Sequence, residues 1–168
     1  WSFLDRPARG EARREGTPVG VTNPLSMDHS VLRQSIVGSL VEVVASNVRH
    51  GRSDVAVFEA GKGYGRVGDA PREWWRLGIA LAGSFDEPGW NRARREADID
   101  DVKGAIELIA RILGAATPAY APLVDEPVLH PGRSATVDAS FRGGDVAISG
   151  VVGELHPRLV EAWELRAR

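Results

Sequence analysis

Two related stretches near the end of the chain, VLHPGRSA (residues 128–135) and GVVGELHP (residues 150–157), decide the fold. Each places Leu-His-Pro at the edge of a run in which apolar residues alternate with polar or small ones. The intervening sequence RGGD (residues 142–145) is typical of a turn, so the pattern predicts a β-hairpin. Because a residue that precedes proline is held in extended geometry, one His-Pro pair is expected to lead into the first strand and the other to close the second.

His130 and His156 are expected to meet at the same end of this hairpin. Two neighbouring imidazoles can bind zinc or share a proton. Glu154 is the obvious third ligand and shares a strand face with His156, but nothing in the sequence sets a partner for it near His130. We therefore predict that the histidines cap the hairpin and that the chain has no metal-binding residues. A small metal-dependent hydrolase built on His130, His156 and Glu154 is kept as an alternative.

The composition is that of one globular domain. A chain of 168 residues, of which 43% are hydrophobic, is long enough to bury a core. Its formal net charge of −2 neither favours nor excludes a polyanionic partner. The absence of cysteine excludes disulfides and thiol chemistry and fits a reducing compartment, so we expect a cytoplasmic protein. No apolar run is long enough to cross a membrane, and a start on WSFL (residues 1–4) indicates that residues 1–168 are a single module excised from a longer protein.

The first part of the chain predicts short strands and one helix. Residues 1–4 and 19–22 are expected to be brief strands, and residues 5–17 a polar loop. Asp28 and Ser30 are both candidate N-caps for a helix whose apolar residues recur at helical spacing from Ile36 to Val48. Gly51 follows the end of this helix.

The next part predicts two strands. Residues 55–66 begin as an apolar strand and continue into the glycine-rich sequence AGKGYGR (residues 60–66). We exclude a phosphate-binding loop, because Lys62 is not followed by Ser or Thr and no helical pattern starts there. The glycines are instead expected to permit close backbone approach within a strand. In the strand that begins at Trp74, three small residues share one face, and another element is expected to pack closely against them: Gly78, Ala80 and Ala82.

A basic stretch beside Trp90 contains Arg92, Arg94 and Arg95, and such a cluster can bind nucleic acid by phosphate pairing and stacking. We interpret it as a solvated loop, because acidic residues balance it: Glu87, Glu96 and Asp98. Asp98 then begins the clearest helix of the chain, which ends before Gly114 and carries an apolar stripe of Ile99, Val102, Ile106, Ile109 and Leu113. The acids Asp98, Asp100 and Asp101 suit the start of a helix better than a cation site.

A strand over residues 120–123, the hairpin and a last helical segment over residues 157–165 complete the chain. Hairpin-type strands with helices inserted between groups predict an α+β fold, in which helices flank an antiparallel sheet. The residues show no Ser-His-Asp order, no carboxylate pair at a catalytic spacing and no cofactor loop. We therefore predict no catalytic and no cofactor-binding residues.

Several segments, in order along nearly the whole chain, resemble the signatures of one family: NPLS (23–26), LRQS (32–35), FEAGK (58–62), DVKG (101–104), LHPGRS (129–134) and GELHP (153–157). They are similar to the catalytic-like module of the β subunit of phenylalanyl-tRNA synthetase. The resemblance implies a fold like that of class II aminoacyl-tRNA synthetases. It also implies an α subunit as partner in an α2β2 heterotetramer, and tRNA, ATP and magnesium as ligands of the whole enzyme rather than of this segment.

The resemblance further implies an incomplete active site, with the chemistry done by the α subunit. A class II site holds the α-phosphate of ATP with an arginine, but where the catalytic subunit has a VYR-like segment this chain reads Gly63-Tyr64-Gly65. Arg66 is expected on the opposite face of the strand. The third class II signature would follow Arg168. An active class II-like adenylating enzyme is the alternative.

The helix over residues 36–48 is the expected contact with the α subunit. In class II-like modules, the helix after the first signature pairs with a partner. Val37, Val41 and Val43 also give this helix more apolar surface than one buried side requires.

Overall fold

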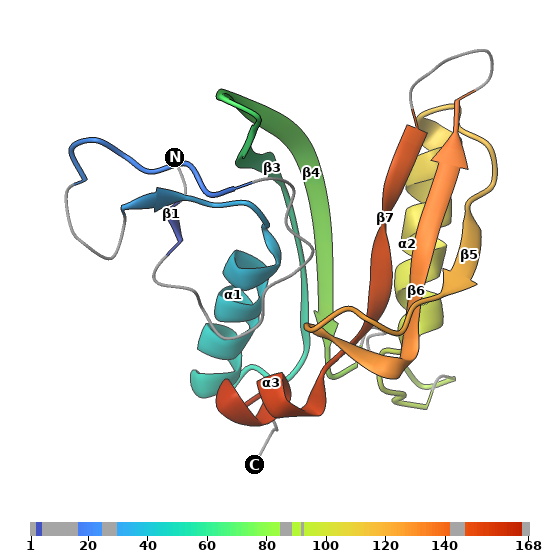
Figure 1. The fold of residues 1–168 in the computed structure, drawn as a ribbon. Helices are drawn as coiled ribbons and strands as arrows, with labels where there is room; N and C mark the ends of the chain where they lie inside the picture. The colour runs from blue at the N-terminus through green and yellow to red at the C-terminus, as the bar shows by residue number, and fades with distance from the viewer. Residues whose placement is uncertain are drawn as a thin grey trace.

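The computed structural model describes residues 3–4, 17–24, 30–84, 89–91, 93–141 and 147–165, with the backbone alone for residues 3–4 and 147. Its elements follow the order β1 (Phe3–Leu4), β2 (Val31–Leu32), α1 (Val37–Arg49), β3 (Val55–Val67), β4 (Ala70–Ala82), α2 (Ile99–Ile112), β5 (Ala119–Pro122), β6 (Leu129–Ser140), β7 (Ala147–Leu155) and α3 (Pro157–Ala162). The strands pair antiparallel as β1-β2, β3-β4 and β5-β6-β7. The predicted α+β class, with antiparallel strands and helices, is confirmed (Figure 1).

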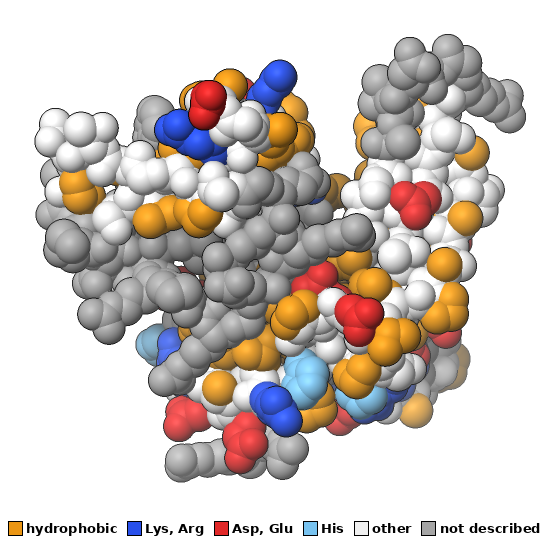
Figure 2. All heavy atoms as spheres, in the orientation of Figure 1, with side chains coloured by type: hydrophobic (Ala, Val, Ile, Leu, Met, Phe, Trp, Pro, Cys, Tyr) orange, Lys and Arg blue, Asp and Glu red, His pale blue; other side chains and the backbone are white. Residues whose placement is uncertain are grey.

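The described elements form two halves, one with α1 beside β3 and β4 and the other with α2 behind β5, β6 and β7 (Figure 1). The halves stand apart at the upper edge, where the space-filling view shows a notch between them (Figure 2). Each half has buried apolar side chains of its own: Ile36, Leu40, Val44 and Val55 in the first, and Ala110, Val137, Ala139 and Val152 in the second. Among the described residues, no helix is both long and apolar enough to cross a lipid bilayer.

The β3–β4 hairpin is the longest continuous ladder of the described chain. Its register runs from Val55 opposite Ala82 to Val67 opposite Ala70. Gly68 and Asp69 form the turn, and Gly68 has a φ of 61°, which suits the first central position of a two-residue hairpin turn. The side chains alternate between an inner face, which α1 covers, and an outer face on the other side.

The small face that the sequence predicts in β4 is where α1 packs. A Cβ atom at Gly78 would lie 2.5 Å from Cδ1 of Leu40 and 2.9 Å from Cδ1 of Ile36. Real Cβ contacts are not that short, so the helix reaches the strand only because residue 78 is glycine. The prediction of close packing at this position is confirmed.

The start of α1 differs from the prediction. Its N-cap is Ile36, which makes no side-chain capping bond, and Ser30 lies before β2 instead. The hydroxyl of Ser35 accepts a hydrogen bond from the amide of Val37 at 3.2 Å and so takes over part of the capping. The other candidate cap, Asp28, lies outside the described residues.

The predicted strand over residues 19–22 is wrong. Gly20 forms only an isolated bridge to Val31, because the segment runs beside β2 for too short a distance to make a ladder. The amides of Val21 and Leu32 still find acceptors across this gap, in Ser30 at 2.8 Å and Val19 at 2.9 Å. Most of the predicted loop over residues 5–17 and the turn at 142–145 lie outside the described residues.

The second half follows the sequence pattern closely. β6 pairs with β7 from Ser134 opposite Gly153 to Ser140 opposite Ala147, with an irregularity between Leu129 and Ser134. β5 and α3 lie within a few residues of their predicted ranges. The stripe of α2 is shorter than expected, because Leu113 at the end of the helix is 56% exposed.

Candidate functional site

Arg33 is a buried charged residue of the N-terminal half, and it makes several polar contacts. It is 6% exposed and forms an ion pair with Glu59 of β3. Its Nε atom also donates to the main-chain carbonyl of Lys62 at 3.0 Å, and the amide of Tyr64 donates to the carbonyl of Arg33 at 2.8 Å. These contacts tie the segment after β2 to the middle of β3.

The glycines of β3 leave room for this segment. A Cβ at Gly61 would meet the guanidinium of Arg33, and a Cβ at Gly63 would lie 2.7 Å from the carbonyl oxygen of Gln34. The prediction that these glycines permit close backbone approach is therefore confirmed.

Gly65 and Arg66 occupy opposite faces of β3, as predicted. Gly65 is buried on the inner face, whereas Arg66 is exposed and donates from Nη1 to the carbonyl of Asp69 at 3.3 Å. On the same face, the guanidinium of Arg33 binds Glu59 and the carbonyl of Lys62. β3 thus has no arginine of its own at position 65, and the residue opposite Gly65 in β4 is the exposed Arg72.

The two His-Pro sequences lie at one end of the β6–β7 pair, because Leu129 is opposite Leu155. In each, the histidine Nδ1 accepts a hydrogen bond from the amide two residues later: His130 from Gly132 at 3.1 Å and His156 from Arg158 at 3.2 Å. His156 is the N-cap of α3, with Pro157 in the first turn. Both histidines thus bind local main-chain amides, but His156 caps α3 and not the hairpin, which differs from the prediction. Histidine side chains reach the surface beside hydrophobic ones in Figure 2.

Glu154 is not directed to a shared site with the histidines. Its carboxylate forms an ion pair with Nη1 of Arg133 at 3.1 Å. Nδ1 of each histidine is occupied by a main-chain amide. Within the part of the chain that the structure describes, no group of three His, Cys, Asp or Glu residues is placed to hold a metal ion.

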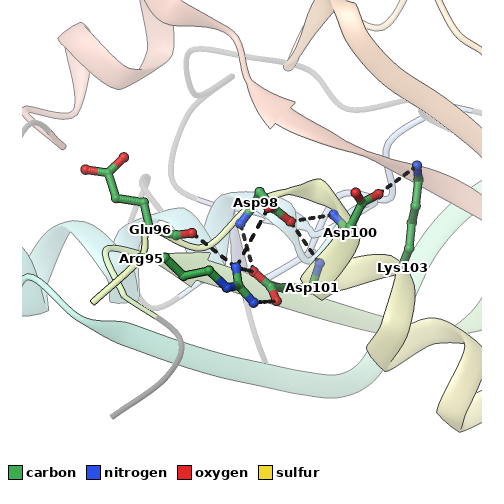
Figure 3. Close-up of polar contacts among 6 residues, drawn as sticks. All are labelled: Arg95, Glu96, Asp98, Asp100, Asp101 and Lys103. Atoms are coloured by element: carbon green, nitrogen blue, oxygen red, sulfur yellow. Dashed lines mark hydrogen bonds and ion pairs between the residues drawn. The ribbon is translucent and has the colours of Figure 1, made fainter. Parts of the chain in front are cut away.

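The acids that begin α2 form a capping box (Figure 3). The carboxylate of Asp98 accepts from the amides of Asp100 at 2.9 Å and Asp101 at 3.2 Å, while Asp101 accepts from the amide of Asp98 at 2.9 Å. Arg95 donates to both oxygens of Asp101. The bonds from Arg95, and then that from the Asp98 amide, lower the pKa of Asp101 from 3.8 to about 2.

The basic stretch is balanced by acids, as predicted, but mostly by other acids than those expected. Arg94 forms an ion pair with Asp54 at 2.6 Å, and Asp54 also accepts from the amide of Ser84 at 2.9 Å. Arg95 pairs with Asp101 and, at 3.7 Å, with the expected Asp98. Arg92 and Glu87 lie outside the described residues. These arginines therefore hold loop 93–98 to the start of α2 and to the end of the hairpin.

The apolar surface of α1 is smaller than the sequence suggests. Val41 is 7% exposed and lies in the core of its own half, so the expectation that it faces a partner is wrong. Val37 is half-buried, and only Val43 of the three is exposed, at 44%. The helix turns more of its circumference toward the hairpin and the preceding segment than one stripe predicts.

Sequence reasoning missed the exposed apolar side chains of the β3–β4 hairpin. Phe58 and Trp75 are each 75% exposed, and Leu77 is 50% exposed. The signal was present in the sequence WWRLGIALA (residues 74–82), which is apolar on both strand faces. Such a run is typical of a strand that is covered on both sides.

Comparisons with known proteins agree on one family. All of residues 1–168 match the family model described as "Phenylalanyl tRNA synthetase beta chain CLM domain". A phenylalanine–tRNA ligase beta subunit of Syntrophotalea carbinolica is 34% identical over 157 residues, which are 92% of this chain and 19% of the relative. The beta subunit of Burkholderia pseudomallei is 34% identical over 174 residues, covering 98% of this chain and 20% of the relative. The beta subunit of Symbiobacterium thermophilum is 35% identical over 152 residues, which are 89% of this chain and 16% of the relative. The chain thus spans 16–20% of the length of these relatives.

Proposed function

Because this chain belongs to the family of phenylalanyl-tRNA synthetase β chain CLM domains, we propose that it serves as a non-catalytic domain of the β subunit of phenylalanine–tRNA ligase. The family match over residues 1–168 is the observation that carries this proposal. In this role the domain supports the assembly of two α and two β subunits, the α-subunit active site and the charging of tRNA with phenylalanine. It has a class II synthetase-like fold and works in the cytoplasm.

The contacts of the polar side chains support a structural role. Arg33, Arg94 and Arg95 are each paired with a carboxylate of the same chain. The histidines bind main-chain amides. By the resemblance to class II synthetases, Gly65 takes the place of the arginine that clamps ATP. Groups that are committed to holding the fold are not free to stabilise charge in a reaction. In this proposal, ATP and magnesium are ligands of the whole enzyme and not of this domain.

A direct test compares the domain with the whole enzyme. The assembled α and β subunits should support phenylalanine-dependent pyrophosphate exchange, whereas residues 1–168 alone should give no exchange above a control without protein. In the assembled enzyme, Arg66→Ala and His156→Ala should leave the exchange rate within about twofold of the wild type. A loss of a hundredfold for Arg66→Ala would favour the adenylating alternative, and stoichiometric zinc in the purified domain would favour the hydrolase.

The contact between α1 and the α subunit is tested by a substitution that the fold tolerates. Val43→Lys changes an exposed side chain and should weaken co-purification with the α subunit while leaving the circular dichroism of the domain unchanged. Val41→Lys is unsuitable, because it would place a charge in the core of the domain. Undiminished co-purification of Val43→Lys would place the α-subunit contact elsewhere.

A further inference from the structure

The outer face of the β3–β4 hairpin carries a patch of exposed apolar side chains. Phe58, Trp75 and Leu77 belong to this face, because each is an odd number of residues along its strand from an inner-face residue, Glu59 or Gly78. The register makes them neighbours: Lys62 lies opposite Trp75, Ala60 opposite Leu77 and Phe58 opposite Ile79. We call these three exposed side chains the outer patch.

The outer patch exposes more contiguous apolar area than isolated surface residues do. An aromatic side chain can bury about 150–250 Å², and both aromatic members are 75% exposed. An apolar patch of a few hundred Å² on a monomer is commonly an interaction site. Trp90 differs, because it is 99% exposed in a loop and is not part of this ladder.

The charges at the rim of the patch favour an apolar protein segment as its partner. The ammonium of Lys62 is paired with Glu73 of the neighbouring strand and lies 5.5 Å from the centroid of the Trp75 ring. Lys62 is thus already neutralised within the hairpin. A phosphate backbone would have to compete with Glu73 for it, whereas an apolar segment can cover the rings without disturbing the pair.

The two faces of β4 favour a lasting partner over a transient one. Its inner face packs under α1 through Gly78, yet its outer face carries Trp75 and Leu77 where a strand facing water would carry polar side chains. A transient partner would leave this surface open to aggregation during folding. Once synthesised, a segment of the same polypeptide stays near the patch at an effective concentration on the order of mM.

The relatives of this chain are long enough to supply such a segment. The matched region is only 19–20% of their length, so about four fifths of each β subunit lies outside it. We propose that, in the intact β subunit, the outer patch of Phe58, Trp75 and Leu77 is covered by an apolar segment of the same polypeptide from outside residues 1–168. This inference rests on the proposed function, since it takes the domain to be part of a β subunit.

Photo-crosslinking in the complete enzyme tests the occupant. The full-length β subunit is produced with p-benzoylphenylalanine at position 75, assembled with the α subunit, irradiated and analysed by peptide mass spectrometry. We expect adducts to β-subunit residues outside residues 1–168. Isotopically light and heavy β subunits, mixed before assembly with the α subunit, should give adducts within one isotope only, because the contact is intramolecular. The control is the same crosslinker at position 74, on the inner face of the same strand, which should reach only residues of the domain itself.

Adducts from position 75 to the α subunit, to tRNA or to a second β subunit would overturn the inference. So would the absence of any adduct when position 74 reacts normally.

A second measurement uses limited proteolysis of the full-length subunit: Trp75→Lys should raise the cleavage rate about tenfold or more, whereas Trp90→Lys should not change it. Assembly with the α subunit and tRNA charging are measured separately. Failure of assembly and of tRNA charging would refute the proposed function. The intramolecular adduct is detected independently of both, because it can also form in the β subunit alone.

Discussion

Arg33 and Glu59 form an ion pair that joins the segment after β2 to β3, across 26 positions of sequence. The side chain of Arg33 is 7% exposed and that of Glu59 is 31% exposed. The guanidinium is therefore the partner whose charge would cost more free energy if it were left unpaired. Its Nε atom also donates to the Lys62 carbonyl at 3.0 Å, and its Nη1 atom donates to the Ser39 hydroxyl at 3.5 Å. A buried guanidinium with these partners holds two segments in place that no regular ladder connects.

Removal of this side chain should destabilise the domain strongly. Arg33→Ala leaves Glu59 without its partner and opens the gap above Gly61, and breaking such a pair typically costs about 3 kcal/mol or more in the free energy of unfolding. Urea denaturation followed by circular dichroism measures the change. Arg52→Ala, which alters an exposed arginine, is the control and should stay within about 0.5 kcal/mol. Equal effects of the two substitutions would show that the ion pair does not hold the fold.

The low pKa of Asp101 predicts how stability depends on pH. Its folded pKa of about 2 lies below the ordinary 3.8, so its contribution is fully present above about pH 4 and is lost as the pH falls toward 2. Asp101→Asn should lower the free energy of unfolding at neutral pH by about 1 kcal/mol. The reason is that the neutral amide binds Arg95 and the Asp98 amide less strongly than the carboxylate does. The difference between Asp101→Asn and the wild type should shrink as the pH falls from 4 to 2. A difference that stays constant over that range would contradict the assignment.

The cap on α3 should depend on an acceptor at position 156 rather than on an imidazole. His156→Ala removes the acceptor of the Arg158 amide and should cost about 1 kcal/mol. His156→Asn keeps a side-chain acceptor suited to an N-cap and should recover most of that loss. Thermal unfolding compares the three proteins, and elemental analysis of each should find no bound metal. An Asn variant as unstable as the Ala variant would mean that the cap contributes little.

Two glycine substitutions should act in opposite directions. Gly78→Ala places a methyl group against Leu40 and Ile36 and should destabilise the domain by about 1–3 kcal/mol, because α1 must move outward. Gly104→Ala lies within α2 and meets nothing within 4 Å, so it should stabilise the domain by about 0.5–1 kcal/mol through helix propensity. Both changes add one methyl group, and chemical denaturation compares them directly. A loss of stability in Gly104→Ala would show that this helix face is covered in solution.

The sequence by itself determined the elements whose causes are local. The alternation around residues 128–157 and the two His-Pro pairs set the β6–β7 hairpin and its capped end, because strand period and proline geometry act over a few residues. Asp98 similarly set the start of α2, since the cap and the amides it accepts are neighbours in the chain.

Only the tertiary structure decided which distant groups meet. Asp54 and Arg94 are 40 positions apart, and nothing in either local pattern selects the other as partner over nearer acids such as Glu96. Likewise, the apolar residues of β4 predict burial on both faces. Packing places α1 against the face of Gly78 and leaves Trp75 and Leu77 on the other. The physical reason is that periodicity fixes which side chains share a face, whereas the element that covers a face is selected by shape and charge across the whole fold.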